Sequence, residues 1–236
     1  MQVPGKNLEL FGLVFAEQGI SPDPKKIDAF ANTKQPTTVS EVRSLLGMAN
    51  YSSKFIKNYA TITEPLRQLT RKNTRFTWTY THQVAYEKLK HVLMSSPVMS
   101  HFYTAKETSV LVDASPVGLS AILTQKDTDQ YTSNVIAYAS RALSHVEQRY
   151  SQTGKEALAI VWGIEHFHLF LFGADFTLIT EHKPFLLIYN NSRSRPLARI
   201  GRWFFRLQQY NFRFICKTGS ENPAYFFVKT PRTKNN

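Results

Sequence analysis

The sequence predicts an α/β fold, in which a mixed sheet carries helices on its faces and follows a small, mainly helical module. Two observations predict it. Apolar strand-like runs alternate with helical patterns after residue 105, an order typical of a mixed sheet covered by helices. Before residue 105, helical patterns dominate. The strands expected in the second half are 109–112, 119–125, 135–142, 176–180 and 211–216, and the helices are 152–172, 184–189, an arginine-rich helix before the last strand and a final helix.

The first hundred residues predict a strand pair followed by short helices. The strand pair covers 8–20 and ends at a Pro-Asp-Pro turn. Thr38 or Ser40 is expected to cap a helix that runs to about Phe55, and Pro65 is expected in the first turn of another. His82, His91 and His101 lack metal-ligand spacing, so we expect no chemical site here. The expected helices are 25–30, 38–55, 62–69 and 82–93, the last capped by Thr81.

Composition excludes several classes of protein. The chain has 236 residues, of which 42% are hydrophobic, enough to form a substantial core. No apolar run reaches membrane-spanning length, and the first residues lack the apolar core of a signal peptide, so we expect an intracellular protein. Cys216 is the single cysteine, which excludes an intramolecular disulfide and a cysteine-rich zinc site.

The positive charge of the chain favours a polyanionic partner. The net charge is +12, and residues 182–220 contain eight Lys or Arg without any Asp or Glu. One alternative is a solvated basic face; contacts with nucleic-acid phosphates explain an arginine stripe without acidic neighbours better. Apolar residues recur on the opposite side of the same helix, at Leu197, Ile200, Phe204 and Leu207. The stripe comprises Arg195, Arg199, Arg202 and Arg206.

Asp113 is a single acid at the end of an apolar strand, before a turn of small residues at 114–118. Burying a carboxylate among Val and Ala is costly unless a metal ion or a hydrogen-bond donor pairs with it. Two interpretations are open from the residues alone: an aspartate that begins a turn, which the spacing favours, and a metal ligand.

Several segments resemble gypsy-type LTR-retrotransposon reverse transcriptases. Residues 10–30, 43–69 and 76–90 are similar to the part after the polymerase palm, and VDASPVGLSAIL (112–123) and YSQTGKEALAIVWGIEHFHLFLFG (150–173) to the ribonuclease H part. The resemblance implies a thumb/connection segment at 1–105, a ribonuclease H-like domain at 106–230 and a tail at 231–236. The family's polymerase site is an Asp-Asp pair upstream of this segment, and the chain has no Asp-Asp dipeptide, so we expect no DNA synthesis from it alone.

The resemblance also implies a set of metal ligands. Asp113 matches the central carboxylate that bridges two metal ions, and Glu156 matches the glutamate of the long helix. Glu181 stands where the family has the Asp of Thr-Asp-His. From the residues alone, a surface acid near a helix N-terminus is the favoured interpretation of Glu156. Two Mg²⁺ ions, or Mn²⁺, are the implied cofactors, because such ions prefer carboxylate oxygens and serve in-line phosphodiester hydrolysis.

Two of the four acidic positions differ from the family. Glu181 has one methylene more than Asp, and a misplacement of about 1 Å in an active site costs roughly 10²-fold in rate. Tyr225 stands where the fourth acid belongs, and a phenol with an ordinary pKa of about 10 is protonated at neutral pH and cannot replace a carboxylate. Glu221 lies a helical turn too early to take over. We therefore expect an impaired site.

The resemblance leaves two functions open. The first is a ribonuclease H-type endonuclease that hydrolyses the RNA strand of an RNA–DNA hybrid at a reduced rate. The second is a non-catalytic, retrotransposon-derived remnant that binds nucleic acid. The resemblance also implies the missing polymerase part of a polyprotein as a partner, and it implies no membrane partner. The implied location is the cytoplasm or a virus-like particle.

Overall fold

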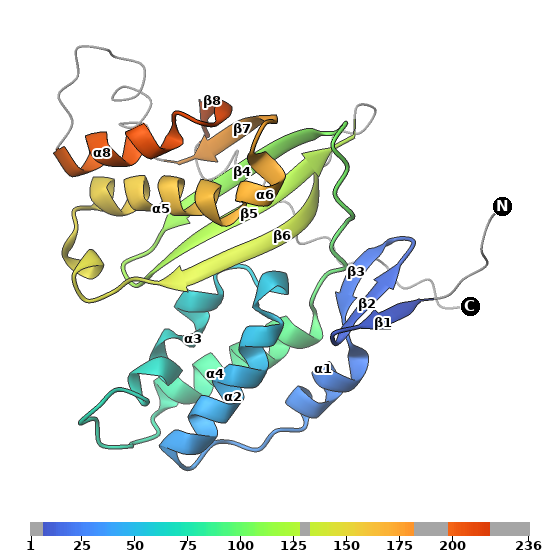
Figure 1. Cartoon of the computed structure of the whole chain (residues 1–236). Helices are drawn as coiled ribbons and strands as arrows, with labels where there is room; N and C mark the ends of the chain where they lie inside the picture. Colours follow the sequence, from blue (N-terminus) through green and yellow to red (C-terminus); the bar gives the residue numbers. More distant parts are fainter. Residues whose placement is uncertain (1–6, 128–132, 182–197, 218–236) are drawn as a thin grey trace.

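A five-stranded mixed sheet forms the second half of the protein (Figure 1). The computed structural model describes residues 7–127, 133–181 and 198–217. The strand order is β6-β5-β4-β7-β8, with β4, β5 and β6 antiparallel and β7 and β8 parallel to β4. The predicted α/β class is therefore confirmed. The strands are β4 (Glu107–Ala114), β5 (Gly118–Lys126), β6 (Ser133–Ala142), β7 (Asp175–Thr180) and β8 (Asn211–Cys216).

Each face of the sheet packs against a different set of helices. Because side chains alternate along a strand, Val110 and Val112 of β4 face one way and Leu111 faces the other. The first face lies under α5 (Gln152–His166), which also contacts α8 (Ala198–Leu207). The second face lies against the helical module, as Figure 1 shows. The sheet is thus covered on both sides.

The long helix predicted at 152–172 is wrong in length. Helix α5 begins after Ser151, whose hydroxyl accepts a hydrogen bond from Gly154 N, and it ends at His166. Phe167, which is 2% exposed, leaves helical geometry, and α6 (His168–Leu171) follows as a separate turn. The helix breaks here because the side chain of Phe167 packs into the hydrophobic cluster beneath α5.

Close packing of α5 on the sheet requires a glycine. A Cβ on Gly163 would lie 2.8 Å from Val112 Cγ1 and 3.0 Å from the Ala121 Cβ. The missing side chain therefore lets the helix approach β4 and β5 directly. This contact also sets the height of α5 above the strand that carries Asp113.

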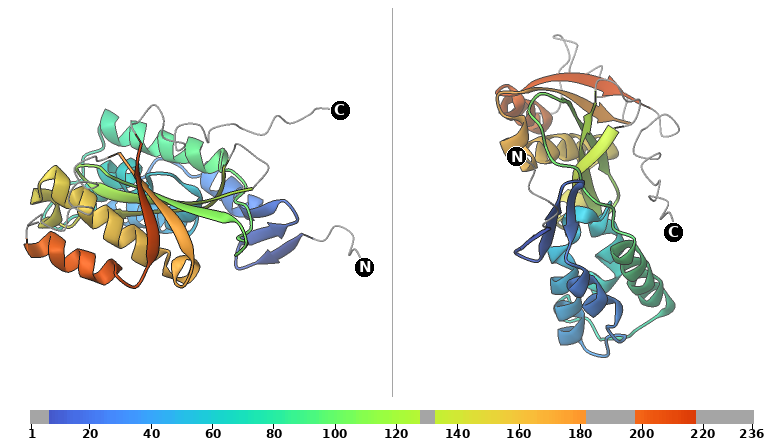
Figure 2. Two further views of the ribbon diagram at one scale, coloured as in Figure 1. Left: turned by 90° about the horizontal axis from the view of Figure 1, so that it is seen from above. Right: turned by 90° about the vertical axis from the view of Figure 1, so that its right-hand side faces the viewer.

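The N-terminal module consists of a small sheet, four α-helices and one short 3₁₀ helix; Figure 2 shows it from two further sides. A turn at Phe11 and Gly12, which both have positive φ, divides the first expected strand in two. Asp23 caps the first helix by accepting a hydrogen bond from Lys25 N. The elements are β1 (Leu8–Leu10), β2 (Leu13–Ala16), β3 (Gly19–Pro22), α1 (Pro24–Ala31), α2 (Val39–Tyr51), the 3₁₀ helix η1 (Ser53–Phe55), α3 (Tyr59–Gln68) and α4 (Tyr80–Met94).

Three helix boundaries differ from the prediction. Helix α2 is capped by Thr38 as expected but ends at Tyr51, and η1 covers the rest of the predicted helix. Helix α3 begins at Tyr59, so that Pro65 lies inside it. Asn58, with a φ of 57°, redirects the chain, and its carbonyl accepts from Thr61 N and Ile62 N. Thr79 rather than Thr81 caps α4.

The module packs tightly on the sheet through η1 and the start of α3. Phe55 is 1% exposed and belongs to one cluster with Ile122 and Tyr138 of the sheet. Ala60 N donates to the hydroxyl of Ser140 on β6 at 3.0 Å. A Cβ on Gly118 would lie 3.1 Å from the Ala60 Cβ, so this glycine allows the close approach.

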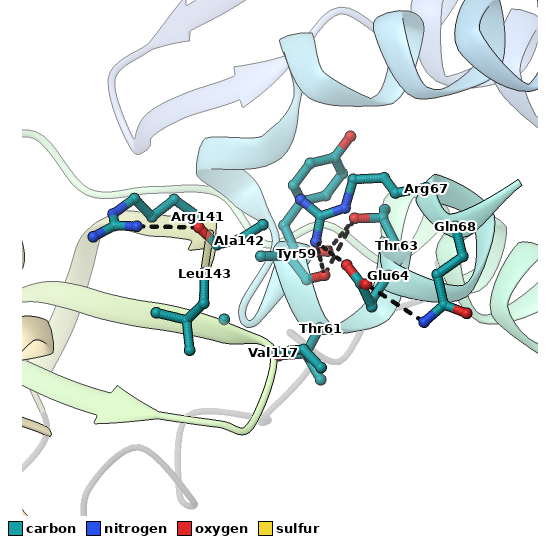
Figure 3. Close-up of polar contacts among 12 residues, drawn as sticks. Tyr59, Thr61, Thr63, Glu64, Arg67, Gln68, Val117, Arg141, Ala142 and Leu143 are labelled. Atoms are coloured by element: carbon teal, nitrogen blue, oxygen red, sulfur yellow. Dashed lines mark hydrogen bonds and ion pairs between the residues drawn. The ribbon is translucent and has the colours of Figure 1, made fainter. Parts of the chain in front are cut away.

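A buried glutamate stabilises α3 beside this contact (Figure 3). Glu64 is 7% exposed and forms ion pairs with Arg67 at 3.2 Å and Arg71 at 2.7 Å. Arg67 also donates to the carbonyl oxygen of Ala60. The N-terminal turn of α3, which faces the sheet, is therefore held by its own side chains as well as by the sheet.

No helix within the described ranges has the length and apolarity needed to cross a membrane.

Candidate active site

Asp113 lies near the end of β4, on the face of the sheet that the helical module covers. It pairs with Ser120 of β5 and shares its face with Leu111. The strand continues for one residue beyond it, to Ala114, so Asp113 does not end the strand as predicted. Its side chain is accessible at this edge of the sheet.

Glu181 lies at the same edge because β7 runs parallel to β4. Leu111 pairs with Ile179, and Asp113 and Glu181 each follow two residues later on their strands. Side chains two residues apart share a face, so both carboxylates project from the C-terminal edge toward the module. The electrostatic influence of Glu181 on Asp113 agrees with this placement.

Glu156 approaches the same edge from α5, on the other face of the sheet. It is 7% exposed, so its interpretation as a surface acid is wrong. The side-chain amide of Gln152 donates both to Glu156 Oε1 at 2.7 Å and to the Ala114 carbonyl oxygen at 3.2 Å. Gln152 thus ties the glutamate to the end of β4, and nothing in the sequence pattern had indicated this role.

Two of the three acids, Asp113 and Glu156, have raised pKa values. The pKa of Glu156 rises to about 7, first because burial disfavours its charge and then because Asp113 and Glu181 repel it, against the hydrogen bond from Gln152. Partial desolvation by neighbouring protein atoms, followed by repulsion from Glu181, also raises the pKa of Asp113, although its side chain is accessible. Repulsion between carboxylates is typical of a site that binds cations.

A lysine that the sequence did not indicate faces this cluster. Lys57 stands between η1 and α3 and interacts electrostatically with both Asp113 and Glu181. Burial lowers its pKa, and the two carboxylates oppose that effect. The sequence carries no signal for this neighbour, because Lys57 lies 56 positions before Asp113.

The oxygen atoms of the three carboxylates are suitable ligands for a divalent ion, but their spacing suits such an ion less well. Carboxylate oxygens are the ligands that Mg²⁺ prefers. In the parts of the chain that the structure describes, however, no three Asp, Glu, His or Cys side chains are grouped closely enough to hold one ion. The fourth family position, Tyr225, lies outside the described residues.

Some arginines of the stripe contact other side chains of the protein. Arg206 forms an ion pair with Glu165 of α5, with contacts of 2.5 and 2.7 Å, so the expectation of a stripe without acidic partners is wrong for this residue. The guanidinium of Arg199 lies 4.2 Å from the centre of the Tyr150 ring. Arg202 is exposed, and its Nε donates to the Ala198 carbonyl oxygen at 3.3 Å.

The apolar side of α8 is confirmed where it is described. Ile200 and Leu207 are 4% and 2% exposed, and Phe204 packs against the same core. Leu197 and Arg195 lie outside the described residues, as does the helix predicted at 184–189. The described part of α8 therefore holds one face on the core and turns its arginines outward.

Comparison with known proteins agrees with this geometry. Residues 78–178 match the family described as an RNase H-like domain found in reverse transcriptase. The Tf2-3 and Tf2-4 transposon polyproteins of Schizosaccharomyces pombe are each 34% identical over 218 residues, which are 91% of this chain and 16% of theirs. The chain thus spans about one sixth of the length of these relatives.

Solved structures show the same fold. A foamy viral protease–reverse transcriptase in complex with RNA/DNA hybrid has a TM-score of 0.70 at 19% identity, covering 90% of this chain and 29% of that one. A dRH form in complex with double-stranded DNA gives 0.70 at 21% identity, covering 89% and 38%. The chain is homologous to part of these transposon polyproteins, and its residues 78–178 match an RNase H-like domain found in reverse transcriptase.

Proposed function

We propose that the chain is the thumb/connection and ribonuclease H part of a retrotransposon reverse transcriptase, and that it hydrolyses the RNA strand of an RNA–DNA hybrid at a reduced rate. Residues 1–105 form the first part, 106–230 the second and 231–236 a tail. The observation that carries the proposal is the gathering of Asp113, Glu156 and Glu181, from three separate elements, at one edge of the sheet.

These three residues would hold Mg²⁺ or Mn²⁺, with Asp113 in the centre. A bound divalent ion supplies an activated water and stabilises the leaving 3′-oxygen. Gln152 orients the carboxylate of Glu156 through its bond to Oε1. The raised pKa of Glu156 leaves that group about half protonated at neutral pH, which weakens it as a ligand until a cation is present.

A non-catalytic nucleic-acid-binding remnant is the second candidate. It is favoured by Glu181 and Tyr225, which stand where the family has Asp, and by the lack of a three-ligand group among the described residues. Both candidates share the same partners: an RNA–DNA hybrid or other nucleic acid, and the polymerase part of a polyprotein. A cytoplasmic or virus-like-particle location follows from the same family relationship.

A cleavage assay on a labelled RNA–DNA hybrid in Mg²⁺ or Mn²⁺ tests the proposed hydrolysis. We expect slow cleavage by the unaltered chain and a loss of more than about 10²-fold in Asp113→Asn, because several kcal/mol of charge stabilisation disappear. Asp175→Asn, at the opposite end of the sheet, is the matched control and should cleave normally. Absence of cleavage by the unaltered chain, with intact hybrid binding, would favour the non-catalytic remnant.

Hybrid binding should depend on the arginines of α8. Replacing Arg199, Arg202 and Arg206 by Gln is expected to lower affinity and to reduce the slope of log K against log salt by about one unit for each lost phosphate contact. Because Arg206 is paired with Glu165, the single change at Arg202 should account for a larger share than that at Arg206. Fluorescence anisotropy between 50 and 200 mM salt, roughly the range over which such contacts weaken, measures both quantities.

The matched control removes three positive charges from exposed lysines of the helical module, Lys34, Lys72 and Lys88. Equal losses of affinity and slope in the control would show that total charge, rather than the stripe, determines binding. An unchanged affinity and slope in the arginine variant would remove the stripe from the binding surface.

A further inference from the structure

The segment that carries Lys57 is fixed on both sides. Before it, Phe55 and Ile56 are 1% and 0% exposed. After it, Tyr59 and Ala60 are 7% and 1% exposed. Asn58 holds the chain in the left-handed region with a φ of 57°. A half-buried lysine between two anchored pairs has few conformations available to its backbone, so its position is set by the packing of the module on the sheet.

The same segment is bonded to the strand end that carries Asp113. The hydroxyls of Thr61 and Ser115 lie 3.1 Å apart, and Ser115 is two residues beyond Asp113. Ala60 N donates to Ser140 Oγ, and that hydroxyl in turn donates to the carbonyl of Leu119 at 3.0 Å. The module is therefore held against the turn that follows Asp113, on the face from which Asp113 and Glu181 project.

The charges complement one another across this contact. Lys57 attracts Asp113 and Glu181, the two acids on its face of the sheet, and Asp113 is influenced by Lys57 in return. Glu156 approaches from the other face, under α5, and is affected by the acids. Two carboxylates thus interact with one lysine from a different part of the chain, and the third, Glu156, interacts with those two carboxylates. Such clustered acids repel one another unless a cation lies near them.

We propose that Lys57 is a built-in counterion, supplied by the helical module to the acid cluster of the RNase H-like domain. It holds Asp113 and Glu181 at the sheet edge when no divalent cation is bound, and it competes with such a cation for them. Lys57 is accordingly a positioning residue that couples the two halves of the chain. The competition rests on the proposed metal-dependent function, whereas the counterion role does not.

A counterion has opposite effects on folding and on metal binding, which a purely structural lysine would not have. Removing its charge leaves the acids uncompensated and weakens the metal-free fold. The same change removes a competing positive charge and strengthens cation binding, by about three- to tenfold for a partly screened charge nearby. A lysine that only fills space would lower both quantities together.

The first experiment needs no metal. Urea unfolding in EDTA is measured for the unaltered chain, Lys57→Gln, Asp113→Asn and the double variant. We expect the destabilisation caused by Lys57→Gln to fall to about half or less when Asp113 is already Asn, because neighbouring charges are not additive. An equal destabilisation in both backgrounds overturns the proposal. If Lys57→Gln folds poorly, Lys57→Arg is measured in its place. This variant keeps the charge and should therefore retain most of the coupling with Asp113.

The second experiment measures Mn²⁺ binding directly, by the electron paramagnetic resonance signal of the free ion. Lys57→Gln should bind about three- to tenfold more tightly than the unaltered chain. Lys54→Gln is the matched control, because Lys54 lies in the same segment but over the Phe55 ring, at 5.5 Å from its centre. Equal or weaker binding by Lys57→Gln overturns the competition.

The two experiments separate this inference from the proposed function. Coupling in EDTA without Mn²⁺ binding by any variant would support the counterion role and remove both the competition and the metal-dependent hydrolysis. Tight Mn²⁺ binding and hybrid cleavage, together with no coupling between Lys57 and Asp113, would support the function and overturn the counterion.

Discussion

Replacing Glu181 and Tyr225 together by Asp is expected to raise the rate of hybrid cleavage by about 10²-fold or more. The shorter carboxylate at 181 moves back by roughly 1 Å, a displacement that costs about 10²-fold in an active site. The new carboxylate at 225 restores the fourth acid that the family pattern contains. Single-turnover cleavage in Mg²⁺ measures the gain, because it does not depend on product release.

Glu181→Asp alone separates the two contributions, and Glu87→Asp, on the exposed side of α4, is the control for a shortened acid far from the site. The control should leave the rate unchanged. A rate that is equally unchanged in the double variant would show that these two positions do not limit catalysis.

Phe55→Ala is expected to lower the free energy of unfolding by about 3–5 kcal/mol, the usual cost of deleting a buried phenyl ring. Phe55 packs between the sheet and the helical module, against Ile122 and Tyr138, with 1% of its surface exposed. The loss should also loosen the adjacent segment that carries Lys57. Urea unfolding followed by tryptophan fluorescence measures the change.

Phe205→Ala is the matched control, because Phe205 on α8 is 68% exposed. Its removal should change stability by less than about 0.5 kcal/mol, as for surface positions in general. Similar effects of the two substitutions would contradict the role of Phe55 as a buried apolar contact between module and sheet.

Local patterns were enough to predict most elements of the sheet. Apolar runs located all five strands of the sheet, β4, β5, β6, β7 and β8, to within about two residues, inside the usual uncertainty of element boundaries. Helix boundaries were predicted less well. Helix α5 ends at Phe167 because the Phe167 ring packs into the core. Helix α3 begins earlier than predicted because the chain turns at Asn58. Neither boundary is visible as a change in the periodicity of the sequence.

The candidate site was also predicted only in part from the sequence. Asp113, Glu156 and Glu181 were found from the sequence through the family resemblance, and the parallel pairing of β4 with β7 agrees with their placement at one edge. Their assignment as metal ligands stays a prediction. The burial of Glu156 and its bond to Gln152 come from the packing of α5 on the strand end, which composition near a helix N-terminus does not reveal.

The sequence by itself determined the α/β class, and its resemblance to a known family selected the candidate acids, because apolar runs, turns and motif residues are local properties. Only the tertiary structure decided which charges meet: Lys57 with Asp113, and Arg206 with Glu165. Each of these pairs joins residues more than forty positions apart, so chain order carries no signal for it, and the packing of α3 and α8 against the rest of the fold brings them together.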